Sequence, residues 1–205
     1  MINKISKRIL AIISNDHHTE QDKEILLFGI TRIVEDIPKT IGIILIGLLL
    51  GIIQEIIVVT IILILYKTFL GGVHAKTNMG CFLYSVLFYL ITIYSSKYIL
   101  FTNNNQIGIY ILIYIFAVYT IIVYAPADVP EIPKINEDLR KSLKIKSVVA
   151  LNLIYLVSFI IINNSNLRVL ILYTVFFTSI MTTRTMYKLF KNEYGYESYI
   201  PDELI

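Results

Sequence analysis

Long apolar stretches separated by short polar stretches run through almost the whole chain. Apolar residues dominate six segments, which cover residues 24–50, 56–70, 82–101, 107–124, 148–162 and 167–181. About 20 apolar residues in a helix are needed to cross a hydrocarbon core roughly 30 Å thick. The pattern predicts an all-α, polytopic integral membrane protein with about six transmembrane helices, forming one domain over residues 1–205.

The two ends of the chain have a different pattern. Residues 1–13 place isoleucine and leucine at helical spacing, with Lys4, Lys7 and Arg8 on the other side. This arrangement is typical of an amphipathic helix that lies in the membrane interface. We therefore expect residues 1–22 to be an interfacial helix and linker, in which His17 and His18 are solvated. Residues 182–205 are polar and are predicted to form a cytoplasmic tail that is exposed beyond its first turns.

Turn-forming and polar residues mark the connections. Gln54 and Glu55 indicate one polar turn, and asparagines indicate turns at residues 103–105 and 163–166. Proline disrupts helices, so Pro126, Pro130 and Pro133 exclude a helix from the loop after residue 124.

The positive charges follow this alternation of spans and connections. When the lysines and arginines are assigned to alternating sides of the six segments, 16 of the 18 fall on one side. Cytoplasmic loops are enriched in these residues. We expect both termini, the loop around residue 74 and the proline-containing loop to be cytoplasmic in a bacterial cell membrane.

Composition excludes several classes of protein. Hydrophobic residues make up 56% of the 205 residues, and the mean hydropathy is +0.71. The single cysteine excludes an intrachain disulfide. The sequence has no nucleotide-binding glycine motif and no zinc-ligand spacing. We therefore expect no cofactor, no metal, no use of ATP and no nucleic-acid partner.

One stretch, residues 67–81, carries the lone cysteine and the only histidine outside the N-terminal region. On a continuous helix, His74 and Cys81 would lie about 10 Å apart along the axis, too far for a hydrogen bond. Gly71 and Gly72 before the histidine, and Asn78 and Gly80 before the cysteine, favour turns. We expect a broken backbone here, with Cys81 in the first turn of a helix that begins at Phe82, where the helix dipole favours a thiolate.

A structural interpretation of both residues stands beside this one. A lone cysteine in a membrane helix is usually a small packing residue, and a histidine near a helix end is usually solvated. A noncatalytic transporter or a peptide-binding sensor partner is the alternative function. Charges within the spans would favour transport, and Glu55 and Lys97 lie near the span ends.

The order of residues around this stretch resembles the core motif of the AgrB family, membrane cysteine endopeptidases that mature quorum-sensing peptides in Gram-positive bacteria. The motif has a basic residue, one or two glycines, His-Ala, and a cysteine seven residues after the histidine. The matching residues here are Lys67, Gly71, Gly72, His74, Ala75 and Cys81. A second match is Tyr124-Ala125-Pro126-Ala127, followed by Pro133 and several lysines, although the sequence 128–132 and Lys134 depart from the family pattern.

This resemblance implies that Cys81 is the nucleophile and His74 the general base. It further implies an AgrD-like precursor peptide with an amphipathic helix and an acidic tail, and release of the product as a thiolactone. It leaves open a homodimer in the lipid bilayer. Cationic residues that could attract the acidic tail are Lys67, Lys76, Arg140, Lys141 and Lys144, unless they only obey the topology rule. The residue that orients His74 stays open: Asn78 and Ser85 are near it in sequence, Glu35 and Asp36 lie on the same predicted side of the membrane, and a dyad without a third member is a further alternative.

Overall fold

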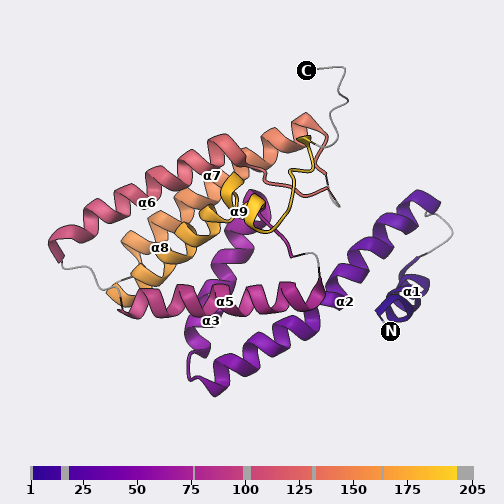
Figure 1. Ribbon diagram of the computed structural model, residues 1–205, viewed down its shortest axis with the longest axis horizontal. Helices are drawn as coiled ribbons and strands as arrows, with labels where there is room; N and C mark the ends of the chain where they lie inside the picture. Colours follow the sequence, from indigo (N-terminus) through magenta and orange to yellow (C-terminus); the bar gives the residue numbers. More distant parts are fainter. Residues whose placement is uncertain are drawn as a thin grey trace. The chain divides into compact units, whose positions relative to one another are not determined.

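The computed structural model describes residues 2–14, 19–75, 77–98, 103–130, 133–162 and 164–197 (Figure 1). Within these ranges the regular secondary structure is helical, and one isolated backbone bridge joins Gly71 to Ala127. The all-α fold class is confirmed. The elements are α1 (Ile2–Ile13), α2 (Glu20–Leu49), α3 (Ile53–Ile62), the π-helix η1 (Leu63–Lys67), α4 (Thr68–Leu70), α5 (Asn78–Tyr98), α6 (Asn103–Tyr124), α7 (Glu137–Ile160), α8 (Ser165–Ile180) and α9 (Arg184–Leu189).

Over their described residues all six predicted apolar segments are mainly helical, but they differ in whether they are long and apolar enough to span a membrane. Among the described residues, four stretches are long and apolar enough to cross a bilayer, namely Ile53–Leu70, Asn78–Tyr98, Ile107–Tyr124 and Glu137–Ile160. Helix α8 is apolar but has only 16 residues. Helix α2 is longer, yet charged residues recur along it from Glu20 to Lys39. The membrane-protein character is thus supported, with four clear spanning candidates in the described part of the chain where about six were predicted.

The chain divides into two compact units, of which residues 1–53 form the first. Here α1 packs against α2. Helix α2 starts earlier than expected because Thr19 and Asp22 form a capping box, in which each side chain accepts a hydrogen bond from the other's backbone N–H. It continues through Pro38 and ends before Gly51, which has a φ of +67°. The helical conformation of residues 2–13 is confirmed, and His17 and His18 lie outside the described residues.

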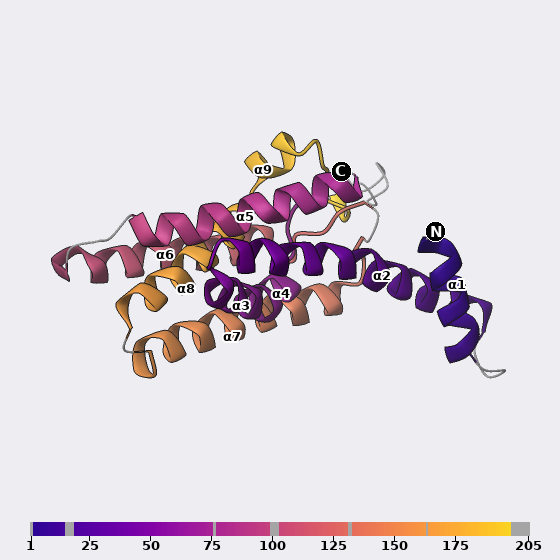
Figure 2. The same cartoon turned by 90° about the horizontal axis from the view of Figure 1, so that it is seen from below.

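The second unit, residues 54–205, is a bundle in which α6, α7 and α8 pack against one another and α5 packs against α8 (Figures 1 and 2). Its core is made of side chains that are almost completely removed from solvent. These include Tyr66, Ala117, Ile121, Leu151 and Val175. Tyr66 also shares a hydrogen bond of 3.1 Å with the Ser179 hydroxyl. The bundle positions the loops at its ends.

Three of the predicted turns are wrong in their boundaries. Gln54 and Glu55 belong to the first turn of α3, and the connection before them is residues 50–52. The asparagines at 103–105 open α6. Asn164 caps α8 by accepting hydrogen bonds from the N–H groups of Asn166 and Leu167. Polar residues of these types are favoured both in turns and at helix starts, so the sequence pattern alone did not separate the two.

The chain alternates between the two ends of the bundle. At one end Lys97, from the end of α5, forms a 2.5 Å ion pair with Glu55, at the start of α3. At the other end, backbone hydrogen bonds join the chain at residues 70–73 to Ala127 of the proline-containing loop and to Met181 at the end of α8. The proline-containing loop is confirmed as non-helical over its described residues. We call this second end the loop end.

The expectation that the tail is exposed beyond its first turns is wrong for Tyr194 and Gly195, which are buried. Helix α9 and the turn after it fold back onto the loop end, and Tyr187 and Tyr194 are 2% and 9% exposed. They pack with Val73, Ala127 and Val129 in a second small core. Tyrosine rings supply enough apolar area to hold a short segment that looks polar in the sequence.

Candidate active site

Two glycines let the chain turn sharply at the loop end. Gly71 and Gly72 have φ angles of +83° and +137°, in the region that favours glycine. A Cβ on Gly71 would collide with the Ala127 carbonyl, and one on Gly72 would lie 3.3 Å from the Met181 carbonyl oxygen. The helix that includes η1 must therefore end at Leu70. The described residues that follow, 71–75 and Thr77, are not helical, and Lys76 lies outside the described residues.

Backbone hydrogen bonds hold this turn against two other segments. The Gly72 N–H donates to Ala127 O at 2.9 Å, and Ala127 N–H donates to Leu70 O at 2.8 Å. The Val73 N–H donates to Met181 O at 3.1 Å. These bonds fix the start of the His74 loop against the proline-containing loop and the end of α8.

His74 is exposed and lies on the wall of a pocket of about 430 Å³. Lys67, Gly71 and Gly72 line the same pocket, so four of the residues that match the motif are brought together. The rest of the wall comes from α3, η1 and α4, from Tyr89 of α5, and from the proline-containing loop through Ala127, Asp128, Val129 and Lys134. Cys81 is not part of this wall.

Cys81 lies in the first turn of α5 and is half-buried. Its N–H donates to Thr77 O at 2.8 Å, and the Thr77 hydroxyl accepts from the Gly80 N–H at 3.0 Å. Thr77 thus caps the helix, which begins at Asn78 rather than at Phe82. The expected turn at Asn78 and Gly80 is wrong for this reason. As predicted, Cys81 lies in the first turn of a helix that follows a non-helical segment.

A buried carboxylate organises the loop beside the pocket. Asp128 is 4% exposed, and its side chain accepts hydrogen bonds from the N–H groups of Lys134, at 2.7 Å, and Tyr196, at 3.3 Å. Arg140 adds a longer contact of 3.4 Å and stacks on the Tyr196 ring at 4.1 Å from its centroid. The Tyr187 hydroxyl donates to the Asp128 carbonyl at 2.8 Å. Asp128 therefore ties together the proline-containing loop, α7 and the C-terminal residues.

Lys134 is a functional candidate that the sequence did not reveal. It lines the pocket with His74, and burial lowers the pKa of its ammonium group. The positive charge of Arg140 lowers this pKa further, while Asp128 acts in the opposite direction. In the sequence, Lys134 is a departure from the family pattern, and only the folded loop places it beside a histidine 60 positions earlier in the chain.

The remaining predicted residues have different surroundings. Lys67 lies 6.0 Å from the centre of the Tyr84 ring. Arg140 is bound to Asp128, as described above, and the Lys144 ammonium donates to Ile122 O at 2.6 Å. Lys141 is exposed and lies 3.7 Å from Glu137. Ser85 is half-buried on α5, one turn after Cys81. Lys67 lines the same pocket as His74, whereas Arg140 binds Asp128 and Lys144 binds the Ile122 carbonyl.

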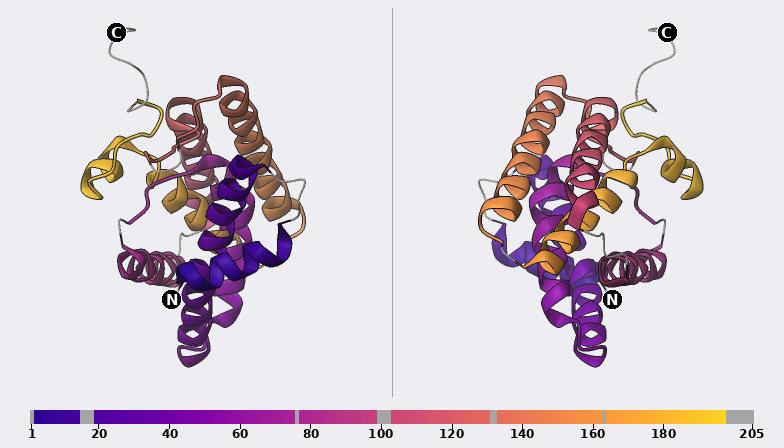
Figure 3. Two further views of the ribbon diagram at one scale, coloured as in Figure 1. Left: turned by 90° about the vertical axis from the view of Figure 1, so that its right-hand side faces the viewer. Right: turned by 90° about the vertical axis from the view of Figure 1, so that its left-hand side faces the viewer.

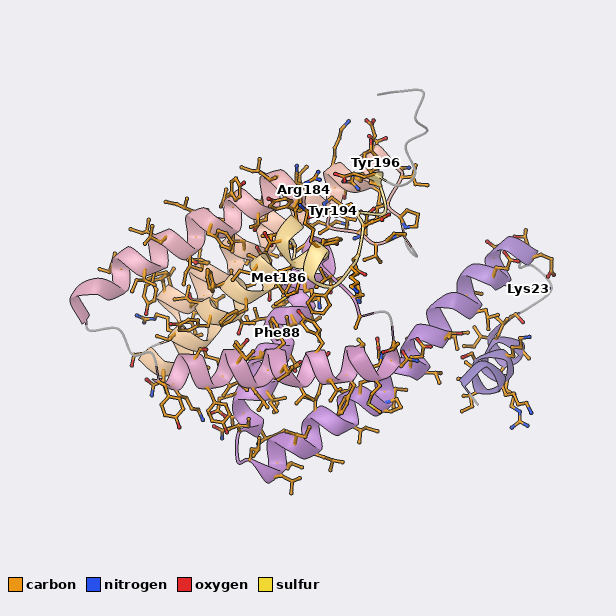
Figure 4. The ribbon with its side chains drawn as sticks, in the orientation of Figure 1. Lys23, Phe88, Arg184, Met186, Tyr194 and Tyr196 are labelled. Atoms are coloured by element: carbon orange, nitrogen blue, oxygen red, sulfur yellow. The ribbon has the colours of Figure 1, made fainter. Side chains whose placement is uncertain are left out.

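The C-terminal residues 184–197 border the site on the outside of the bundle, as the yellow segment in Figure 3 shows. Arg184 lies 5.6 Å from the centre of the Tyr194 ring, and the two side chains are neighbours in Figure 4. The Asn192 side-chain amide donates to the His74 carbonyl at 2.6 Å. Within the part of the chain that the structure describes, no cluster of three or more His, Cys, Asp or Glu side chains could hold a metal ion.

Comparison with known proteins identifies the family. The family pattern of accessory gene regulator B, AgrB, matches residues 1–182. An AgrB-like protein of Clostridium acetobutylicum is 27% identical over 176 residues, which cover 84% of this chain and 82% of the relative. An AgrB-like protein of Listeria monocytogenes is 25% identical over 199 residues, 95% of each chain. No solved structure matches. The chain belongs to the AgrB family, and this membership supports a role in the processing of quorum-sensing peptides at a membrane.

Proposed function

We propose that this protein is a membrane-embedded cysteine endopeptidase that cleaves an AgrD-like precursor peptide, with Cys81 as nucleophile and His74 as general base. One observation carries the proposal. The helical backbone is interrupted between Leu70 and Asn78, which leaves His74 on a pocket wall and Cys81 in the first turn of the next helix. An unbroken helix would hold the two side chains apart.

The reaction uses the thiol and the imidazole in turn. His74 accepts the thiol proton, and the Cys81 sulfur attacks the carbonyl carbon of the scissile peptide bond. The carbon–nitrogen bond then breaks, and His74 delivers the proton to the leaving amine. The N-terminal part of the peptide remains attached to Cys81 as a thioester, and the C-terminal part departs.

The thioester is resolved by a cysteine within the bound peptide. The peptide thiol attacks the same carbonyl carbon, a new thioester closes a ring, and the Cys81 sulfur regains a proton. One thioester replaces another, so no ATP is needed for the step. The product is a cyclic thiolactone.

Two lysines near His74 favour a substrate with negative charge. Lys67 and Lys134 both line the pocket, and a partly dehydrated site strengthens attraction to a carboxylate. Lys141 is exposed and is a further candidate for docking, together with Lys76, which lies outside the described residues. The test is a pull-down of the precursor by the Lys67→Gln variant, with Lys144→Gln as the comparison variant. Weaker capture by Lys67→Gln alone supports docking, whereas equal capture by both variants and wild type dismisses it.

Coexpression with the precursor tests the proposal. Cys81→Ala, Cys81→Ser and His74→Ala are expected to leave the precursor at full length, as read by mass spectrometry. Met79→Ala is the matched control, because Met79 lies in the same helical turn and is 68% exposed. Mature peptide produced by Cys81→Ala at the wild-type level would refute the proposal.

The alternative of a noncatalytic transporter gains no support from the charges near the spans. Glu55 and Lys97 pair with each other at the end of the bundle away from the pocket. Because Cys81 is the single cysteine, alkylation reports on it alone. If histidine activates this cysteine, the thiol should be alkylated well below about pH 8, and this reactivity should be lost in the His74→Ala variant. An inert thiol at that pH would favour the alternative.

A further inference from the structure

The match to the AgrB family ends at residue 182, yet the protein continues in an ordered segment that contacts the candidate site. This C-terminal segment is residues 184–197. It begins with α9, and its chain then reverses at Lys191, whose φ is +53°. The Asn192 N–H donates to Tyr187 O at 2.9 Å, which closes the turn and directs Asn192 back along the helix. The position of Asn192 is therefore defined by the backbone.

Asn192 reaches the backbone of the histidine itself. Its side-chain amide donates to the His74 carbonyl oxygen at 2.6 Å, across 118 positions of sequence. Upstream, Val73 is already fixed to Met181 through its N–H. The peptide unit that follows the His74 Cα is thus held directly, and the backbone is also held one residue upstream at Val73, which limits the directions in which the imidazole can point.

The segment is anchored firmly enough to act as a support. The Tyr194 hydroxyl donates to Thr182 O at 2.6 Å, and Tyr187 stacks on Tyr194 with 4.0 Å between ring centroids. Tyr196 is tied to Asp128 through its N–H. On the other side, Phe190 packs edge-on against Tyr84 at 4.9 Å. Tyr84 lies three residues after Cys81 and so projects from the same face of α5.

We propose that Asn192 is a positioning residue for His74, and that the C-terminal segment sets the placement of the His74 loop relative to the first turn of α5. The segment touches the backbone of the candidate base and, through Phe190, the helix that carries the candidate nucleophile. The inference rests on the proposed function, and it adds a residue outside the region that the family match covers.

The test uses the full-length protein with Asn192→Ala, Asn192→Asp and Asn192→Gln. Aspartate keeps the shape but cannot donate, so Ala and Asp are both expected to slow precursor cleavage about tenfold. Gln retains a donor and is expected to recover part of the rate. Lys188→Gln, an exposed change on α9, is the control and should cleave like wild type.

A second readout separates positioning from general stability. In the Ala and Asp variants, the pH dependence of Cys81 alkylation should move toward that of an ordinary thiol, while precursor capture stays at the wild-type level. Wild-type cleavage and an unchanged alkylation profile in both variants would overturn the inference. So would loss of folding in all three variants, since Asn192 would then serve stability. Failure of the proposed function is distinct, because it appears as maturation by Cys81→Ala.

Discussion

The conformation of Gly71 is the residue-scale feature on which the site depends most. Its positive φ and the nearby Ala127 carbonyl leave no room for a side chain. We expect Gly71→Ala to lower the free energy of unfolding by about 2 kcal/mol or more, from backbone strain and steric overlap. Thermal unfolding in detergent measures this change. Cleavage should fall with it, because the His74 loop starts at this turn.

Gly108→Ala is the control for this substitution. Gly108 lies within α6, and a Cβ there meets nothing within 4 Å. Alanine should be neutral or stabilising at that position by roughly 0.5–1 kcal/mol. Equal stability of Gly71→Ala and wild type would contradict the close approach seen between Gly71 and Ala127.

Lys134 gives a prediction about pH. Burial lowers the pKa of Lys134 below its ordinary value of 10.5. Between the two pKa values the unfolded chain holds one more proton than the folded protein, so this lysine makes stability rise with pH in that window. Lys134→Met removes the cost of burying the charge. The variant should be more stable than wild type at about pH 8, and its advantage should shrink toward about pH 10.

The comparison between variant and wild type is needed because other groups titrate in the same range. Burial raises the pKa of Tyr187 and Tyr194, and these tyrosines make stability fall above about pH 10. They contribute equally to both proteins. Lys141→Met, at an exposed lysine, is the control. A stability difference that is constant with pH would show that Lys134 is not buried as a charge.

At this scale the sequence singled out the two candidate catalytic residues but not the residues that surround them. The lone cysteine and the histidine seven residues before it stood out by spacing and by family motif. Thr77 did not, because a threonine is recognised as a helix cap only when the start of the helix is known. Lys134 could not be found either, since its burial results from contacts between residues distant in sequence.

At the scale of elements, the proline-containing loop is held by Asp128. We expect Asp128→Ala to lower the free energy of unfolding by about 3–5 kcal/mol, because it removes the carboxylate that pairs with Arg140 and leaves the backbone donors of Lys134 and Tyr196 without their acceptor. The C-terminal segment should detach. Limited proteolysis after residue 183, followed by mass spectrometry, detects this.

Two variants sharpen this experiment. Asp138→Ala changes an exposed acid in the first turn of α7 and should leave proteolysis unchanged. Asp128→Asn keeps the shape and an acceptor oxygen, so its loss of stability should be smaller than that of alanine. Resistance of Asp128→Ala to proteolysis at the wild-type level would exclude the anchoring role.

Apolar patterning predicted the existence of the helices better than their ends. Helix α7 begins at Glu137, well before the apolar run that indicated it, because Asn136 caps it and two acidic residues follow in its first turn. Its first turns are polar and project beyond the apolar part. Hydropathy reports where a helix is surrounded by apolar groups, whereas capping decides where it starts.

At the scale of the whole molecule, the charge distribution predicts that the loop end faces the cytoplasm. In a Cys81→Ser background, Lys188→Cys lies at the loop end and Asn166→Cys at the other end of the bundle; both positions are exposed. An impermeant thiol reagent added to intact cells should label only Asn166→Cys, by the positive-inside rule. Mass-tag shift on gels measures the labelling.

Permeabilised cells provide the control, since both cysteines should then react. Labelling of Lys188→Cys from outside, with Asn166→Cys protected, would invert the orientation. In that case the candidate site would face away from the compartment in which the precursor is made, and the proposed function would need a different route for the substrate.

The sequence predicted the membrane class, the all-α fold and the order of the helices, because these depend on local hydrophobicity. It did not predict that residues 184–197 return to the loop end. That return depends on Tyr187 and Tyr194, whose burial is possible only after Val73, Ala127 and Val129 have been brought together. Long-range packing of this kind leaves no periodic signal in a short polar segment.

The central claim is that Cys81 carries the peptide as a thioester. The most direct measurement is the intact mass of the protein after incubation with a precursor whose internal cysteine is replaced by serine, which blocks thiolactone formation. We expect an adduct equal to the N-terminal peptide fragment on Cys81, removed by hydroxylamine and missing from Cys81→Ser. Two results would contradict the claim: cleavage of the precursor by the wild-type protein without an adduct, or cleavage by Cys81→Ser at the wild-type rate.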